Sequence, residues 1–301
     1  MERARLYGDQ LGLTSLSRRR FLQATAGLAG AAFLTDTVIL EPNHPHVVRV
    51  EMPLARLPEA FDGFTICQLS DFHYHPHWSN HIISAAVGMA NPLQPDLFVL
   101  TGDFVTLPIA SDYFGLRLST ALNAEPCAQM LTPLHAKEGR LCVLGNHDVN
   151  TRTSLVIEIL QSFNLPVLDN RAVAIERDGK RLWIAGVDDY LNGEPDLDLA
   201  MKGVPVDEPV IMLCHEPDVV KHVAKYAVDL QLSGHSHGGQ VAWPGVGPVY
   251  LPPLARRYPR GLYRFGPMTL YTNIGLGTIR VHMRMNCPPE ITLFTLRARK
   301  A

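Results

Sequence analysis

The sequence predicts an α/β domain built on two stacked sheets, and two observations support this prediction. From Phe64 onward, short apolar runs bounded by turn residues recur along the chain, as expected for buried strands. Stretches with helical spacing separate the earlier runs, whereas the second half of the chain is richer in strand-like runs. The predicted strands lie within residues 64–71, 96–103, 140–148, 181–189, 209–216, 228–237, 268–277 and 290–298. The predicted helices span residues 79–90, 116–136, 154–163 and 218–226.

The composition is that of a folded protein without the charge of a nucleic-acid-binding protein. The chain has 301 residues, 47% of them hydrophobic, which is enough to bury one large core or two small ones. The formal net charge is -2, and residues 1–40 hold five of the 27 Lys and Arg but three of the 29 Asp and Glu. The rest of the chain is therefore acidic, which argues against a nucleic-acid partner.

The amino terminus has the order of an export signal. Arginines at positions 18–20 precede Phe21 and Leu22, and an apolar stretch rich in Ala and Gly runs from Ala24 to Leu40. This order is typical of a twin-arginine signal and predicts export by that machinery to the periplasm or cell envelope. An amphipathic helix with a basic start is the alternative. We therefore predict a signal segment over residues 1–40, cleaved or anchoring, and a folded domain over residues 41–301.

The sequence leaves open whether this segment is removed. Small residues at 29–31 lie early in the apolar run, and no clear cleavage pattern stands near Leu40. The stretch is barely long enough to cross a bilayer. Its polar residues, which make a crossing costly, are Gln23, Thr25, Thr35, Asp36 and Thr37. We expect removal or peripheral attachment to the membrane.

The cysteines are predicted to pack in the core and not to form disulfides. Their number, five, is odd, and three of them stand inside apolar strand-like runs. A chain that folds in the reducing cytoplasm before export has no need of disulfides.

Five short polar motifs each follow an apolar run. They read SDFH, TGDF, GNHD, LCHE and GHSHGG, and they begin at residues 70, 101, 145, 213 and 234. Open α/β folds bind ligands at the carboxyl ends of their strands, so we expect the motifs to meet at one edge. Together they indicate a two-metal hydrolytic centre. The side chains they supply are Asp71, His73, Asp103, Asn146, His147, Asp148, His215, His235 and His237.

The donor types indicate how two cations would be held. Asp71 and His73 are one residue apart, so both project to one side of an extended strand end and can hold one cation. The two oxygens of Asp103 can bridge cations that are about 3.5–4 Å apart. Imidazoles beside carboxylates favour Mn, Fe, Zn or Ni over Mg or Ca. We expect two divalent ions, with manganese favoured.

His147 has two interpretations. Next to Asn146 it can act as a general acid, with Asp148 orienting its ring, or it can be a structural hydrogen-bonding residue. We predict the catalytic role for His147 and Asp148.

These motifs, in this order, resemble those of the calcineurin-like metallophosphoesterase superfamily, and the match runs from about Phe64 to the carboxyl terminus. The resemblance implies a four-layer α/β/β/α sandwich. It also implies that Asp103 is shared by two metal sites, one completed by Asp71, His73 and His237 and the other by Asn146, His215 and His235. GHSHGGQ, the later Gly261-Leu262-Tyr263 and the terminal RMNCPPEI are similar to the bacterial exported phosphodiesterase branch, which is similar to UDP-2,3-diacylglucosamine pyrophosphatases.

The implied reaction is hydrolysis of a phosphodiester or pyrophosphate by a metal-bridging hydroxide, with an envelope lipid-linked or nucleotide-linked substrate. The irregular stretch from Trp243 to Pro267 is expected to lie over the site as a binding loop. The alternatives are a phosphomonoesterase, a nuclease, or a noncatalytic metal-binding envelope protein. Candidates for contact with the substrate's second substituent are Arg284, Trp243 and Tyr258, and then Tyr113, Phe114, Tyr250, Arg256 and Arg257.

Overall fold

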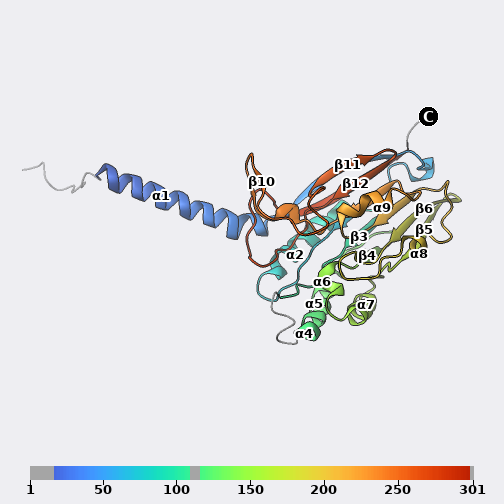
Figure 1. Cartoon of the computed structure of the whole chain (residues 1–301), viewed down its shortest axis with the longest axis horizontal. Coiled ribbons are helices and arrows are strands. Elements are labelled where there is room, and N and C mark those ends of the chain that lie inside the picture. Colours follow the sequence, from blue (N-terminus) through green and yellow to red (C-terminus); the bar gives the residue numbers. More distant parts are fainter. Residues whose placement is uncertain (1–16, 109–115, 299–301) are drawn as a thin grey trace, which may run out of the picture.

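Two mixed sheets form the centre of the protein (Figure 1). The computed structural model describes residues 17–108 and 116–298. The first sheet has the strand order β1 (His46–Leu54), β13 (Glu290–Ala298), β2 (Thr65–Leu69), β3 (Leu97–Thr101) and β4 (Arg140–Val143). The second has the order β11 (Gly261–Phe265), β12 (Met268–Thr272), β8 (Leu230–Ser233), β7 (Val210–Leu213), β6 (Lys180–Gly186) and β5 (Arg171–Arg177). A two-stranded hairpin, β9 (Ala242–Trp243) and β10 (Gly247–Pro248), lies apart from both.

The strands that precede the polar motifs run parallel within each sheet. β2, β3 and β4 are parallel neighbours in the first sheet, and β7 and β8 are parallel neighbours in the second. Their carboxyl ends therefore meet at one edge, as the sequence predicted. The Asp71 amide donates to the Gly102 carbonyl (2.9 Å), and the Gly234 amide donates to the His215 carbonyl (3.0 Å), which fixes the loops to one another.

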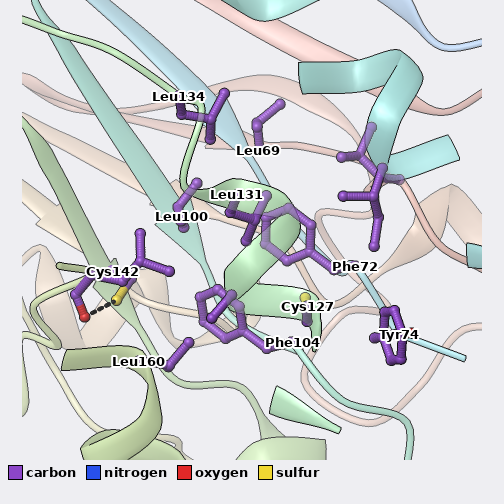
Figure 2. Close-up of a cluster of buried hydrophobic side chains, with 14 of the residues drawn as sticks. Leu69, Phe72, Tyr74, Leu100, Phe104, Cys127, Leu131, Leu134, Cys142 and Leu160 are labelled. Carbon is purple, nitrogen blue, oxygen red and sulfur yellow. Dashed lines mark hydrogen bonds between the residues drawn. The ribbon is translucent and has the colours of Figure 1, made fainter. Parts of the chain in front are cut away.

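The sheets pack face to face, and helices cover their outer faces, which gives four layers. Residues such as Ile66, Phe294, Ile184 and Leu232 fill the space between the sheets. On the outer face of the first sheet, α2 (Ser79–Ala90), α5 (Ala124–Leu131) and α7 (Thr153–Ser162) bury a second cluster, part of which Figure 2 shows. On the outer face of the second sheet, α8 (Leu197–Ala200) and α9 (Val220–Val223) bury a third. Each fully buried side chain of this kind contributes about 1.5–3 kcal/mol. The predicted α/β/β/α sandwich is confirmed.

Two predicted helices are shorter than expected. The stretch 116–136 is divided into α4 (Arg117–Leu122) and α5, because Pro126 fits the first turn of a helix but cannot continue a preceding one. The stretch 218–226 becomes a 3-10 turn, Pro217–Val219, followed by the single turn of α9. A further short helix, α6 (Asn146–Val149), starts within the GNHD motif itself.

The amino-terminal helix stands away from the body of the protein (Figure 1). α1 (Arg18–Thr35) begins at Ser17, whose hydroxyl accepts from the Arg20 amide (3.4 Å), and none of its residues is buried. A π-helical turn, Asp36–Leu40, and a 3-10 turn, Glu41–Asn43, continue it. By length and composition alone, Arg18–Asn43 meets the requirements of a membrane span, as signal sequences also do.

The base of this helix is fastened to the domain. The Thr37 carbonyl accepts from the Arg284 amide (2.9 Å), and the Glu41 carboxylate accepts from the amides of Asn286 (3.1 Å) and Cys287 (2.6 Å). Thr37 is buried, although it lies on the amino-terminal side of the proposed boundary at residue 40. Residues on both sides of the proposed boundary, Thr37 and Glu41, therefore contact the same segment of the domain, residues 284–287.

All five cysteines are buried and unpaired, as predicted. Figure 2 shows Cys127 and Cys142 among leucines of the cluster that α2, α5 and α7 bury on the outer face of the first sheet. Burial raises the pKa of the Cys67 thiol to about 12, so it is protonated and unreactive.

Candidate metal centre

Strained backbone aims most of the predicted ligands into one buried space. Asp71, His73, Asp103, His235 and His237 all have positive φ angles, between 44° and 67°. Such angles are uncommon for residues other than glycine, and they persist where the surrounding structure imposes them. Each of these residues lies two or four residues beyond the end of β2, β3 or β8, so the left-handed turns stand in the loops that carry the SDFH, TGDF and GHSHGG motifs.

Asp71, His73 and His237 form one group of converging donor atoms. His237 Nε2 lies 3.0 Å from His73 Nε2 and 3.4 Å from Asp71 Oδ1. The carboxylate of Asp71 accepts from the His235 amide at 3.0 Å, which holds it between the SDFH and GHSHGG loops. All three side chains are buried.

Asp103, His215 and His235 form a second group. Asp103 Oδ2 lies 3.2 Å from His215 Nε2 and 3.4 Å from His73 Nε2, so this one carboxylate faces imidazoles of both groups. His215 Nδ1 bonds to the Thr101 carbonyl (2.6 Å), and His235 Nε2 bonds to the Pro253 carbonyl (2.9 Å). Each ring therefore keeps its other nitrogen as a lone-pair donor, as in most histidine metal sites.

Several buried polar atoms at the centre have no hydrogen-bond partner among the described residues. They are His73 Nδ1, Asn146 Oδ1, His215 Nε2 and His237 Nδ1. Buried polar atoms without a partner cost about 1–3 kcal/mol each. The atoms that face the carboxylates of Asp71 and Asp103 are Nε2 of His73, His215 and His237. Together with the unpartnered Asn146 amide oxygen they make the donor set of a divalent cation of intermediate softness, so the residues present fit such an ion.

Burial favours the neutral form of His73 and His235, which metal binding needs. It lowers the pKa of His73 to about 3 and that of His235 to about 4. Burial alone would also lower the pKa of His215, but attraction to Asp103 outweighs it and raises that pKa well above its usual value. Burial alone would raise the pKa of Asp103, but attraction to His215 and His147 outweighs it and holds this carboxyl well below its usual range. The group shared by both clusters is thus an anion.

His147 stands beside the centre with one ring nitrogen already in use. Its Nδ1 accepts from the Leu107 amide at 2.9 Å, and its ring meets that of His73 edge to face, 4.7 Å between centroids. The His147 amide donates to Asp103 Oδ1 (2.9 Å). Because Nδ1 accepts, the proton of the neutral ring is on Nε2.

Asp148 does not orient the His147 ring, which corrects the role predicted for it. Its Oδ1 accepts from the Val105 amide and its Oδ2 from the Gly145 amide, both at 3.0 Å. The carboxylate therefore caps the first turn of α6 and ties the GNHD loop to the TGDF loop. Leu107 is the residue that holds the ring. A backbone amide makes this contact, so the sequence carried no signal for it.

A model of the calcineurin-like phosphoesterase family matches residues 64–239. The "Phosphodiesterase YaeI" of Escherichia coli (strain K12) is 32% identical over 288 residues, which cover 93% of this chain and 99% of the relative. The chain belongs to the calcineurin-like phosphoesterase family. It is thus a metal-dependent phosphoric ester hydrolase.

Two further relatives have names that describe a membrane-spanning protein and a pyrophosphatase, respectively. A "Transmembrane protein with metallophosphoesterase domain" of Danio rerio is 32% identical over 267 residues, which cover 84% of this chain and 57% of the relative. The "UDP-2,3-diacylglucosamine pyrophosphatase LpxG" of Chlamydia trachomatis is 26% identical over 310 residues, which cover 84% of this chain and 90% of the relative. Hydrolysis of both diesters and pyrophosphates is thus represented among the named relatives.

A cavity of about 350 Å³ opens onto the centre of this phosphoesterase. Asp103, Asn146, His147, His235 and His237 form its polar floor. Its walls are mostly apolar and come from the segments 249–253 and 279–281 together with Leu191 and Val241. The volume suits a small-molecule ligand. Segment 249–253 belongs to the irregular stretch predicted to lie over the site, whereas β11 takes residues 261–265 of that stretch into the second sheet.

Arg284 is not a substrate-binding residue, contrary to the prediction. Its side chain is completely buried, and its guanidinium donates to four backbone carbonyls, those of Ile274, Gly275, Gly277 and Cys287. Burial lowers its pKa to about 10. The guanidinium therefore serves as a structural link between the two ends of the long connection from β12 to β13, residues 273–289.

Trp243 and Tyr258 do not line the cavity as the structure describes it. Trp243 is exposed on the β9–β10 hairpin, and Tyr258 packs edge to face against Tyr263 and Phe265 at 5.0 and 5.2 Å. Of the other aromatic candidates, Tyr250 does line the cavity. Tyr113 and Phe114 lie outside the described residues. The wall residues that sequence reasoning missed include Leu191, in the loop after β6, and Arg280, in the loop after β12, and neither stands in a recognisable motif.

Proposed function

We propose that this phosphoesterase hydrolyses a phosphodiester or pyrophosphate with two divalent cations that share Asp103. The observation that supports this is the position of Asp103 Oδ2, 3.4 Å from an imidazole of one ligand group and 3.2 Å from an imidazole of the other. In this proposal one site consists of Asp71, His73, Asp103 and His237. The other consists of Asp103, Asn146, His215 and His235. Manganese is the ion that we favour for these oxygen and imidazole donors.

The protein's own side chains would prepare the phosphoryl group for attack. Two bound divalent cations would supply Lewis acidity at the phosphoryl oxygens and acidify the attacking water. Asp103, which faces both ligand groups, would neutralise part of the charge of cations held there. His147 lines the cavity floor, and its Nε2–H can donate a hydrogen bond to a phosphoryl oxygen or to the leaving oxygen, where negative charge develops.

The cavity walls favour an ester with two substituents. A monoester binds mainly through its phosphate, whereas a diester or pyrophosphate has a second group that can occupy apolar wall space beside Val249, Tyr250 and Val281. The acidic balance of residues 41–301 disfavours a nuclease. We therefore propose a lipid-linked or nucleotide-linked substrate.

The substrate would be met at the cell envelope. The arginines at 18–20 and the exposed apolar helix after them support twin-arginine export, with residues 1–40 as signal or anchor and residues 41–301 as the phosphoesterase domain. The transmembrane relative is consistent with an anchored form.

Hydrolysis of bis(4-nitrophenyl) phosphate and of 4-nitrophenyl phosphate by the Mn-loaded full chain tests this proposal. We expect the diester to be the better substrate and Asp103→Asn to abolish its turnover. Asp178→Asn is a matched control, because Asp178 also has a positive φ (50°) but is exposed in the β5–β6 turn. Preference for the monoester would overturn the proposed substrate class, and a fully active Asp103→Asn would overturn the bridge.

A further inference from the structure

We infer that the β9–β10 hairpin, the segment 279–282 and the base of α1 form one face that docks on a phospholipid bilayer. This docking face adjoins the cavity through Val249, Tyr250 and the segment 279–281. Its consequence, which rests on the proposed function, is that the phosphodiester substrate is carried by a lipid whose acyl chains stay in the bilayer during hydrolysis.

The docking face exposes several large apolar side chains, four of them within residues 243–250. On and after the hairpin, Trp243, Val246, Val249 and Tyr250 are 54%, 86%, 64% and 52% exposed, and Val281 across the cavity mouth is 58% exposed. A cluster of this kind is uncommon on soluble surfaces and marks an interaction site. Trp and Tyr are the aromatic residues that concentrate at bilayer interfaces.

The docking face is continuous with the helix that resembles a membrane span. The rings of Trp243 and Phe33 stack with 6.5 Å between centroids and 14° between planes. Figure 1 shows α1 leaving the body beside β10. Ile39 and Leu40, at the base of the helix, are also exposed. A bilayer that holds the apolar helix would thus bring its surface to the hairpin. The hydrogen bonds of Thr37 and Glu41 to residues 284–287 fix the position of the base of the helix on the domain.

The charge of the helix fits a bilayer better than a soluble protein partner. Arg18, Arg19 and Arg20 stand at its far end, and no Lys or Arg occurs between Phe21 and Asn43. Basic side chains that flank an apolar segment are typical of membrane anchors.

The docking face and the cavity share residues. Val249, Tyr250 and Val281 are exposed and also line the cavity, so its mouth opens among the residues that would touch lipid. Arg280 lines the cavity and lies over the Tyr250 ring, 5.3 Å from its centroid. An exposed guanidinium at this position can meet a lipid phosphate at headgroup depth.

Depth-dependent quenching tests the docking. The full chain is reconstituted into phosphatidylcholine vesicles with or without bromine on the upper acyl carbons, and tryptophan emission is compared between wild type and Trp243→Phe. We expect bromine to quench wild type and Trp243→Phe to lose a substantial part of that quenching. Equal quenching in both proteins overturns the docking face. Emission of Trp243 that changes with protein concentration and not with bromine overturns it in favour of a second copy of the chain.

Turnover in vesicles tests the lipid-borne substrate. Val246→Asp, at a position outside the cavity lining, should leave turnover of soluble bis(4-nitrophenyl) phosphate unchanged. It should lower turnover of a 4-nitrophenyl phosphodiester of dioleoylglycerol in vesicles about tenfold or more. Val206→Asp is the matched control, because Val206 is 80% exposed and its carbonyl accepts from Arg56 in the segment after β1.

The two readouts separate failure of this inference from failure of the proposed function. An enzyme inactive on both esters would overturn the proposed phosphodiesterase, whatever the quenching shows. Equal loss of vesicle turnover in Val246→Asp and Val206→Asp, or no loss in either, overturns the inference while leaving the soluble diesterase intact.

Discussion

The Nε2 atoms of His73 and His237 lie 3.0 Å apart inside the protein, and Nδ1 of neither ring has a hydrogen-bond partner among the described residues. Burial lowers the pKa of both imidazoles, so a shared positive charge is not favoured there. Two neutral rings in this arrangement direct lone pairs to one point, which a cation can occupy. The fold thus brings these two imidazoles together although the protein's own hydrogen bonds leave a nitrogen of each ring without a partner among the described residues.

Removal of divalent ions should lower the stability of this phosphoesterase and abolish its turnover. Ligands that converge only in the folded chain couple metal binding to folding, and free metal at 100 times its Kd stabilises by about 2.7 kcal/mol per site. Calorimetry of the chelated protein, before and after addition of Mn, measures the shift. If addition of Mn to the chelated protein left its melting temperature unchanged, the two ligand groups would not bind the metal.

His147→Ala should keep bound metal and lose turnover by a factor of about 10²–10³, as expected for loss of a hydrogen-bond donor to the charge that develops in the transition state. The loss should grow as the leaving group becomes more basic, which a series of aryl esters measures. His135→Ala, in an exposed loop, is the control. A loss that is equal for all leaving groups would assign His147 to phosphoryl binding only.

Asp148→Ala should destabilise the fold more than His147→Ala does. It leaves the buried amides of Val105 and Gly145 without acceptors, at a cost of about 1–3 kcal/mol each. Urea unfolding of the two variants measures the difference. If Asp148→Ala were as stable as wild type, the carboxylate would not be the structural link between the two loops.

Arg284→Lys should also act through stability. A lysine cannot serve the four carbonyls that the planar guanidinium reaches, so we expect a loss of about 3–5 kcal/mol, typical of a broken buried network. The KM of the folded fraction for an aryl diester should stay unchanged. A raised KM with unchanged stability would restore Arg284 to the substrate site.

The sequence predicted the ligand loops because each follows a continuous apolar run, as TGDF follows β3. It predicted the four layers only through the family resemblance. Edge strands such as β1 and β5 were missed, because they are partly exposed. Their apolar residues are interrupted by charged ones, so they show no continuous apolar run. Asp148 and Arg284 were given wrong roles because their partners are backbone groups, which leave no trace in residue type.

The central claim is that one carboxylate, Asp103, joins two metal sites, and the metal content of the purified full chain tests it most directly. Mn-loaded wild type and Asp178→Asn should each retain about two equivalents per chain after desalting, and Asp103→Asn about one or fewer. Two equivalents retained by Asp103→Asn, or a single equivalent in wild type, would contradict a shared binuclear centre.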